Sequence, residues 1–356
     1  MSIQTYKNTK IYVIAPANTK SGGPELLHQL VYHLRNDLNL DAYIYYIPSE
    51  HPNPVHNEFK QYNVPFVREI EDKKENLLIA PEVINRINEL KTYSTLRKII
   101  WWLSVDNFYI SYFIKYNKIF YAQHIFNIFI KRLFGKPLFN AENLIYKYLS
   151  YKKNRLDIRN IFNNIDFHLV QSTYAAKHLN KIGIPKEKIL YLSDYLSKEF
   201  LKSQFEIKDK KDIIVYNPNK GFHFTKKIIK KAPHLNFIPL INMSKEQIIN
   251  TLKLAKVYID FGNHPGKDRL PREAAILGCC IITGKRGSAK YFEDLPIPKE
   301  FKFSDKKENI PHIISKIEEC FENYEQKIKE FEYYRNYIKK EPTKFINDLK
   351  KIFTNK

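Results

Sequence analysis

Charged residues able to hold a polar ligand gather in one stretch, residues 256–289 (KVYIDFGNHPGKDRLPREAAILGCCIITGKRGSA). They lie around a predicted helix start at Pro271, where a proline is tolerated because its missing N–H would be unpaired anyway. A helix N-terminus presents free N–H groups and partial positive charge, so it suits an anion. A carboxylate in the first turn could also accept two hydrogen bonds from a sugar diol. The candidate side chains are Asp268, Arg269, Arg272 and Glu273.

Predicted strands position these residues. Strands at 256–261 and 279–283 flank the helix, and each is followed by a loop, so both loops lie at carboxyl ends of strands, where open α/β sheets bind ligands. The second loop offers the backbone N–H groups of Gly287 and Ser288. The structural alternative is that Glu273 only stabilises the helix dipole and that Asp268 pairs with Arg269.

Two further loops follow predicted strands. In SGGPE, residues 21–25, Gly22 and Gly23 allow a ligand to approach the backbone closely. In YNPNKG, residues 216–221, Lys220 is a point charge suited to a diphosphate. The alternative for both loops is an ordinary turn between a strand and a helix.

The pattern of strands and helices occurs twice, which predicts an α/β fold with two doubly wound parallel sheets. We expect domains at 1–205 and 206–335, followed by a C-terminal helix at 336–356 that packs back on the first domain. A ligand would then bind between the domains. The predicted strands are 10–16, 42–47, 77–80, 98–104, 165–171 and 189–192, then 212–216, 235–240, 256–261 and 279–283.

Composition narrows the class of partner. The chain has 356 residues and a net charge of +21, which favours nucleic acid, an anionic membrane surface or a phosphorylated substrate. Three cysteines, of which Cys279 and Cys280 fall in a predicted core strand, make no disulfide framework. The sequence shows no signal-peptide pattern and no apolar stretch of ~18 residues that could span a membrane. We therefore expect a cytoplasmic protein.

Residues 108–155 are both aromatic and basic. Lysines and arginines alternate there with tyrosine, phenylalanine and isoleucine, which favours a surface that rests on the anionic inner face of a membrane. The alternative is a set of ordinary helices with lysines on the solvated side. The basic residues are Lys115, Lys118, Lys131, Arg132 and Lys136.

Several chemistries are excluded. No G-x-G-x-x-G, Walker A or G-x-S-x-G sequence occurs. His51 and His56 have no companions at zinc-ligand spacing. The positive charge is not accompanied by any known nucleic-acid-binding module, so we expect no nucleic-acid partner.

The second half resembles the nucleotide-sugar-binding domain of GT-B glycosyltransferases, most nearly the family 4 and family 4-like enzymes of bacterial surface polysaccharide synthesis. The resemblance implies a GT-B fold, in which two Rossmann-like domains face each other across a cleft. It covers DIIVYNPNKG, FIPLINMSKEQIINTLKLAKVYIDFG and LPREAAILGCCIITGKRGSA, and more weakly SGGPELLHQLVYHL and IDFHLVQSTYAAKHL.

The resemblance also implies roles. Lys220 would bind the donor diphosphate, Glu273 the donor ribose, and Gly22 and Gly23 would belong to a loop that closes on donor and acceptor. No metal or other cofactor is expected, because a lysine, an arginine and a helix end can stabilise the leaving diphosphate. The other implied donor contacts are Asn217, Asn219, Gly221, His264, Arg269, Arg272, Gly287 and Ser288.

One position departs from the family pattern. Family 4 enzymes carry a second acid eight residues before the one matched by Glu273, and here that position is Pro265. Asp268 could replace the missing acid. Alternatively the enzyme could invert the anomeric centre, with Asp106 or Glu25 as the base.

These expectations together describe a cytoplasmic, membrane-peripheral glycosyltransferase. It would move a sugar from a nucleotide sugar to a growing, lipid-linked glycan of a bacterial capsule, O-antigen or lipooligosaccharide. Three alternatives stay open at this point: a sugar-nucleotide epimerase of the same fold, a basic nucleic-acid-binding protein, and a non-catalytic glycan-binding relative.

Overall fold

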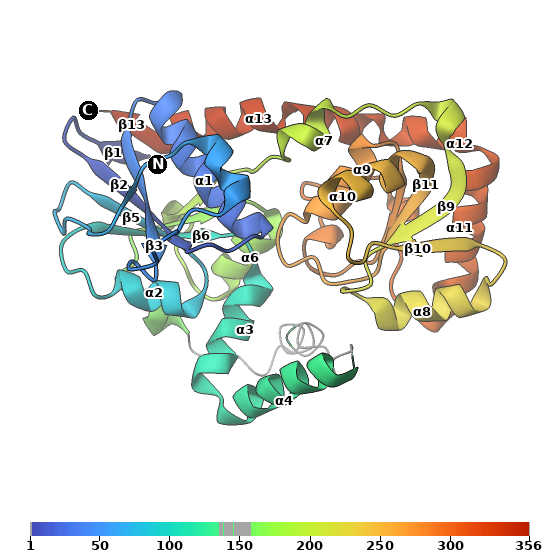
Figure 1. Ribbon diagram of the computed structural model, residues 1–356, viewed down its shortest axis with the longest axis horizontal. Helices are drawn as coiled ribbons and strands as arrows, with labels where there is room; N and C mark the ends of the chain where they lie inside the picture. The colour runs from blue at the N-terminus through green and yellow to red at the C-terminus, as the bar shows by residue number, and fades with distance from the viewer. Residues whose placement is uncertain (1, 135–137, 139–144, 146–157, 356) are drawn as a thin grey trace. The chain divides into compact units, whose positions relative to one another are not determined.

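The computed structural model describes residues 2–134, 138, 145 and 158–355, which form two compact units (Figure 1). Unit 1 comprises residues 1–194 and 343–356, and unit 2 comprises residues 195–342. The second boundary falls at Pro342, inside the long helix α13 (Glu332–Ile352). Each unit contains a parallel sheet and a hydrophobic core of its own.

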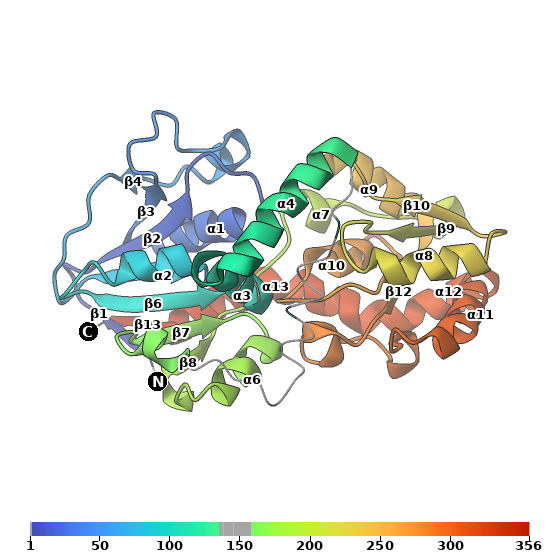
Figure 2. The ribbon, with the colours of Figure 1, turned by 90° about the horizontal axis from the view of Figure 1, so that it is seen from below.

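Unit 1 is built on a seven-stranded parallel sheet in the order β4-β3-β2-β5-β6-β7-β8 (Figure 2). The strands are β2 (Lys10–Pro16), β3 (Asp41–Ile47), β4 (Phe66–Val67), β5 (Leu77–Pro81), β6 (Arg97–Trp102), β7 (Phe167–Val170) and β8 (Ile189–Tyr191). The helices are α1 (Gly22–Asn36), α2 (Ile84–Leu90), α3 (Val105–Tyr116), α4 (Lys118–Phe134) and α6 (Thr173–Lys181).

Both faces of this sheet are covered. Trp101 and Trp102 are successive residues of β6, so their side chains point to opposite faces, and both are fully buried. Trp101 packs against Phe345 of α13, and Trp102 packs against Phe108 of α3. Because both faces of the sheet are buried, the sequences of β5 and β6 contain nearly continuous apolar runs instead of apolar residues alternating with polar ones.

The two ends of the chain pair with each other in unit 1. Strand β1 (Ile3–Thr5) lies parallel to β13 (Phe353–Asn355), with Ile3 opposite Phe353, and both of these side chains are buried (Figure 1). The segment after Pro342 therefore belongs to the same unit as the N-terminus.

Unit 2 is built on a four-stranded parallel sheet in the order β10-β9-β11-β12. The strands are β9 (Lys211–Tyr216), β10 (Asn236–Pro239), β11 (Ala255–Asp260) and β12 (Cys280–Thr283). The helices are α7 (Lys198–Lys202), α8 (Phe222–Lys231), α9 (Lys245–Leu254), α10 (Arg269–Ile276), α11 (Ile310–Glu322) and α12 (Tyr324–Lys327). Cys279 and Cys280 are buried free thiols, as expected for core positions.

The predicted α/β fold with parallel sheets is confirmed in both units, and the observed strands overlap all the predicted ones. Two helix predictions need correction. Helix α10 begins at Arg269, so Pro271 is its third residue and not its first. The C-terminal helix expected at 336–356 begins earlier and ends earlier, because α13 runs from Glu332 through Pro342 to Ile352.

Candidate functional site

Three loops meet at the carboxyl ends of the strands of unit 2. They follow β9 (residues 217–221), β11 (261–268) and β12 (284–290), three strands that lie side by side in the sheet. The contact between the first two loops is so close that a Cβ on Gly221 would lie 2.3 Å from the backbone carbon of Phe261. Gly221 also has a φ of +60°, which favours glycine. The predicted ligand-binding loops are thus neighbours in space.

The third loop is attached to the second by its backbone. The Ser288 N–H donates to the carbonyl oxygen of His264 at 2.8 Å, and the Ser288 hydroxyl donates to that of Gly266 at 2.5 Å. The predicted free N–H of Ser288 is therefore already bonded inside the protein. Gly287 has a φ of +58° and touches the His264 backbone, so its glycine character serves the packing of the two loops.

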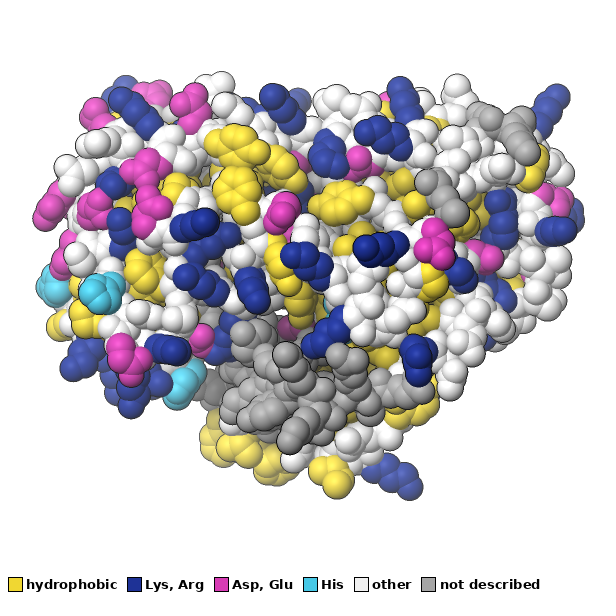
Figure 3. All heavy atoms as spheres, turned by 180° about the vertical axis from the view of Figure 1, so that it is seen from behind, with side chains coloured by type: hydrophobic (Ala, Val, Ile, Leu, Met, Phe, Trp, Pro, Cys, Tyr) yellow, Lys and Arg dark blue, Asp and Glu magenta, His cyan; other side chains and the backbone are white. Residues whose placement is uncertain are grey.

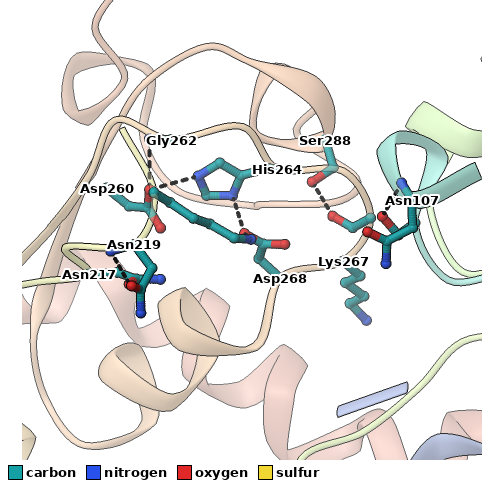
Figure 4. Close-up of polar contacts among 12 residues, drawn as sticks. Asn107, Asn217, Asn219, Asp260, Gly262, His264, Lys267, Asp268 and Ser288 are labelled. Carbon is teal, nitrogen blue, oxygen red and sulfur yellow. Dashed lines mark hydrogen bonds and ion pairs between the residues drawn. The ribbon is translucent and has the colours of Figure 1, made fainter. Parts of the chain in front are cut away.

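Four charged side chains form the centre of the site. The ring of His264 lies between two carboxylates, with Nε2 3.7 Å from Asp260 Oδ1 and Nδ1 3.6 Å from Asp268 Oδ2 (Figure 4). Lys220 Nζ donates to Asp268 Oδ2 at 2.9 Å. Asp260 also accepts hydrogen bonds from the Tyr258 hydroxyl at 3.0 Å and from the Gly262 N–H at 2.8 Å. We call Asp260, His264, Asp268 and Lys220 the charge cluster.

The charge cluster shifts the pKa values of its members. Burial by itself lowers the pKa of His264, but the charges of Asp260 and Asp268 outweigh this and raise it above its ordinary value. Burial likewise works to raise the pKa of Asp260, but His264, Lys220 and the Gly262 N–H together hold it below its usual range. Both shifts favour the charged forms, an imidazolium at His264 and a carboxylate at Asp260.

Three members of the charge cluster are also candidate metal ligands. Asp260, His264 and Asp268 each offer one atom within a 4.8 Å span, the only such group among the residues that the structure describes. However, the two carboxylates face different ring nitrogens, whereas a metal ion takes a single imidazole nitrogen, and the Lys220 ammonium already neutralises Asp268 (Figure 4). These residues fit a protonated histidine better than a metal ion.

Three of the predicted residues lie at or near the start of helix α10. Asp268 is its N-cap residue, but the side chain makes no capping hydrogen bond because it is turned toward Lys220. Glu273 is the fifth residue and so lies in the second turn, not in the first turn as predicted. Arg269 Nε lies 3.8 Å from Glu273 Oε1, one helical turn away.

Arg272 is fully buried inside unit 2. Its side chain is 0% exposed, and its Nη1 donates to Glu341 Oε2 of α13 at 3.0 Å. The other oxygen of Glu341 lies 2.6 Å from Lys267 Nζ, and Lys267 points away from His264 (Figure 4). The predicted donor contact of Arg272 is therefore corrected to a structural one: the residue anchors the 261–268 loop and α10 to α13.

The predicted residues of unit 1 lie at the carboxyl edge of its sheet. Gly22 and Gly23 are the first two residues of α1, which follows β2. Glu25 is buried in the same helix and accepts a hydrogen bond from the Tyr62 hydroxyl at 3.0 Å. Asp106 is buried in the first turn of α3, which follows β6.

Sequence reasoning missed Glu82 in unit 1. It comes directly after β5, the strand between β2 and β6, and its carboxylate accepts the Leu103 N–H at 3.0 Å. Burial raises the pKa of Glu82 to about 7, although hydrogen bonds from backbone N–H groups oppose the shift. Such a carboxyl could exchange a proton near neutral pH. The available signal was an acid at the end of a buried strand, which also describes Asp260.

Comparison with known proteins adds a fold assignment. No protein-family model matches the sequence, and no curated protein matches it. The structure is similar to that of Anabaena HepE in complex with UDP-glucose, with a TM-score of 0.57, 10% identity and coverage of 96% of this chain and 98% of that one. It is also similar to sucrose-phosphate synthase from Thermosynechococcus elongatus, with a TM-score of 0.57, 11% identity and coverage of 94% and 95%. The apo form of the lipopolysaccharide outer core galactosyltransferase WaaB has a TM-score of 0.51 and 12% identity, with coverage of 96% and 98%.

The chain has the GT-B fold. The expected GT-B architecture is thereby confirmed, with one Rossmann-like sheet in each unit. Within this fold, the charge cluster lies at the carboxyl ends of the strands of the C-terminal GT-B unit, where open parallel sheets bind their ligands.

Proposed function

We propose that the protein is a glycosyltransferase that moves a sugar from a nucleotide sugar to a lipid-linked bacterial surface glycan. The observation that carries the proposal is the meeting of Lys220, the start of α10 and the loop of Gly287 at one edge of the unit 2 sheet. A GT-B protein with UDP-glucose bound and a lipopolysaccharide galactosyltransferase share the fold, which supports the choice of donor and acceptor class.

The proposed donor site assigns each polar group to one part of the nucleotide sugar. Lys220 binds the diphosphate and Glu273 the ribose, while Asn217, Asn219 and Arg269 supply further polar contacts. As the nucleoside diphosphate leaves, Lys220 and the N-terminus of α10 stabilise its charge, and no metal ion is required. Gly22 and Gly23 are proposed acceptor contacts.

The stereochemical course depends on which acid acts. Pro265 stands where family 4 enzymes carry the second acid. In a retaining reaction, Asp268 would do the work of that missing acid. An inverting reaction would need a base in unit 1, for which Asp106 and Glu25 are the candidates. The anomeric configuration of the product, determined by NMR, decides between them.

Lys220→Ala and Glu273→Ala should each weaken binding of UDP-glucose by about 10- to 100-fold, because a hydrogen bond to a charged group contributes about 1.5–3 kcal/mol. Isothermal titration calorimetry measures the affinity, and a thermal melt checks folding. The matched controls are Lys226→Ala and Glu246→Ala, since both residues are exposed in unit 2. Unchanged affinity in both test variants would contradict the proposed donor site.

We also propose that α4 binds a membrane surface. Eight of its large apolar side chains are each 47% to 73% exposed, which is unusual for a surface helix (Figure 3). Exposed Lys115, Lys118 and Arg132 lie beside them and suit anionic lipid. Lys136, most of 139–155 and the side chain of Lys131 lie outside the described residues. The exposed apolar residues are Ile119, Tyr121, Ile125, Phe126, Ile128, Phe129, Leu133 and Phe134.

No helix among the described residues is long and apolar enough to cross a membrane, so α4 would lie in the lipid surface. The double substitution Ile125→Glu with Phe129→Glu should reduce binding to vesicles containing one quarter phosphatidylglycerol by more than 100-fold. Each buried side chain of this size contributes about 1.5–3 kcal/mol. Vesicle co-sedimentation measures the effect. Gln123→Glu on the same helix adds charge without removing apolar area, and it should change binding only slightly.

A further inference from the structure

The charge cluster poses a problem for an anionic ligand. Lys220, the proposed diphosphate contact, already donates to Asp268 at 2.9 Å. A bound diphosphate would share the Lys220 ammonium, so this cation would no longer neutralise Asp268 alone. Asp268 and Asp260 would then face the diphosphate as two like charges unless another cation neutralises them.

His264 is the cation in position to do so. It is buried between the two carboxylates, and its ring nitrogens face one carboxylate each, at 3.7 Å and 3.6 Å. Its Nε2 makes no hydrogen bond among the described residues, so donation to Asp260 is a contact that the site can still gain. A neutral imidazole could donate to only one of the two aspartates, whereas an imidazolium can donate to both.

We propose that His264 is a positioning residue: when the donor is bound it is an imidazolium that holds Asp260 and Asp268 while the donor diphosphate draws on Lys220. The proposal rests on the proposed function, because it assumes a nucleotide sugar in this site. It also predicts that donor binding is coupled to protonation, because the negative diphosphate favours the protonated form of His264. At any pH where His264 is partly neutral in the free protein, donor binding should therefore take up a proton from solution.

The charged groups that face His264 favour its protonated form on balance. Asp260 at the end of β11 and Asp268 at the start of α10 stabilise the imidazolium, and Lys220 after β9 opposes it. The pKa of His264 is raised by the balance of these charges despite burial. Its contribution to stability is accordingly full below the ordinary pKa of histidine and is lost as the pH rises through the raised value. Loss of the Lys220 charge to a diphosphate should raise the pKa of His264 further.

The test is a calorimetric titration with UDP-glucose between pH 6 and pH 9, in buffers of low and high ionisation enthalpy. The diphosphate of a nucleotide sugar has no proton that titrates in this range, so proton uptake that the native protein shows and His264→Gln lacks belongs to His264. The affinity should fall about tenfold or more from pH 6.5 to pH 9, with net proton uptake. His264→Gln should bind more weakly at pH 6.5, with no uptake and a flat pH profile.

Two controls separate this role from a merely structural one. His234→Gln, at an exposed histidine of the same unit, should keep the full pH dependence. Asp268→Asn removes one of the charges that require the proton, so its pH dependence should be smaller than that of the native protein. If His264→Gln does not fold, an NMR titration of His264 in the native protein replaces it. The pKa of His264 should then be higher with UDP-glucose than without it.

The outcomes are distinguishable. UDP-glucose binding without proton uptake, or an undiminished pH profile in His264→Gln, would overturn the role of His264 and leave the proposed donor site standing. A native protein that binds no UDP-glucose at any pH would overturn the proposed donor together with this role.

Discussion

Glu341→Gln is expected to destabilise unit 2 by about 3–5 kcal/mol, the usual cost of removing one partner from a buried ion pair. Glu341 is fully buried and lies between two cations, with Arg272 Nη1 at 3.0 Å and Lys267 Nζ at 2.6 Å. Glutamine has nearly the same shape but no charge, so both cations would remain buried without a counter-ion. The 261–268 loop and α10 should loosen first, because Glu341 ties them to α13.

The measurement has to resolve the two units. Both tryptophans, Trp101 and Trp102, lie in unit 1, so tryptophan fluorescence during denaturation reports on that unit. Hydrogen exchange of the β11 and β12 amides reports on unit 2, and the loss of stability should appear there as faster exchange. Glu325→Gln is the matched control, since Glu325 is exposed in α12 of the same unit. Equal exchange rates in the two variants would show that the buried trio contributes nothing to stability.

Gly287→Ala should have the second largest effect, a loss of about 2–5 kcal/mol. The left-handed conformation at φ +58° costs an L-residue about 1–2 kcal/mol. A new Cβ would also lie 2.0 Å from the carbonyl oxygen of His264, so one of the two loops must shift, at a further cost of about 1–3 kcal/mol. The shift moves His264, so the affinity for UDP-glucose should also fall at least tenfold.

A matched substitution is available three residues earlier. A Cβ on Gly284 would lie 3.5 Å from the Cα of Phe261, an ordinary van der Waals contact, so Gly284→Ala should change stability by less than about 1 kcal/mol. Chemical denaturation and calorimetry with UDP-glucose measure both variants. If Gly287→Ala behaves like Gly284→Ala, the close contact between the two loops does not exist in solution.

Local pattern was sufficient to predict the strands and the loops that follow them. KIYVIAP and IDFHLVQ are short apolar runs bounded by polar residues, and both contain a strand of the sheet. Ser172 caps α6, since its hydroxyl accepts the Ala175 N–H. Gly278 follows the end of α10 with a φ of +83°, a conformation that favours glycine. Each of these features depends on residues within a few positions of one another.

The roles of individual charges in the site could not be predicted in the same way. Arg272 and Glu273 are adjacent in the sequence, yet Arg272 is fully buried against Glu341, 69 residues later. Ser288 supplies its N–H to His264, and Lys220 supplies its ammonium to Asp268. Nothing in the local sequence distinguishes a charge that faces a ligand from one that faces a partner in the core.

The sequence by itself determined the alternation of strands and helices and the position of three loops at strand ends, because hydrophobic periodicity and turn residues act over a few positions. The GT-B architecture was implied by the resemblance of its motifs to a known family. Only the tertiary structure decided that His264 lies between Asp260 and Asp268, that Arg272 is structural, and that β1 pairs with β13. Those facts depend on the packing of segments far apart in the chain, where burial and the nearest opposite charge set each side chain's role.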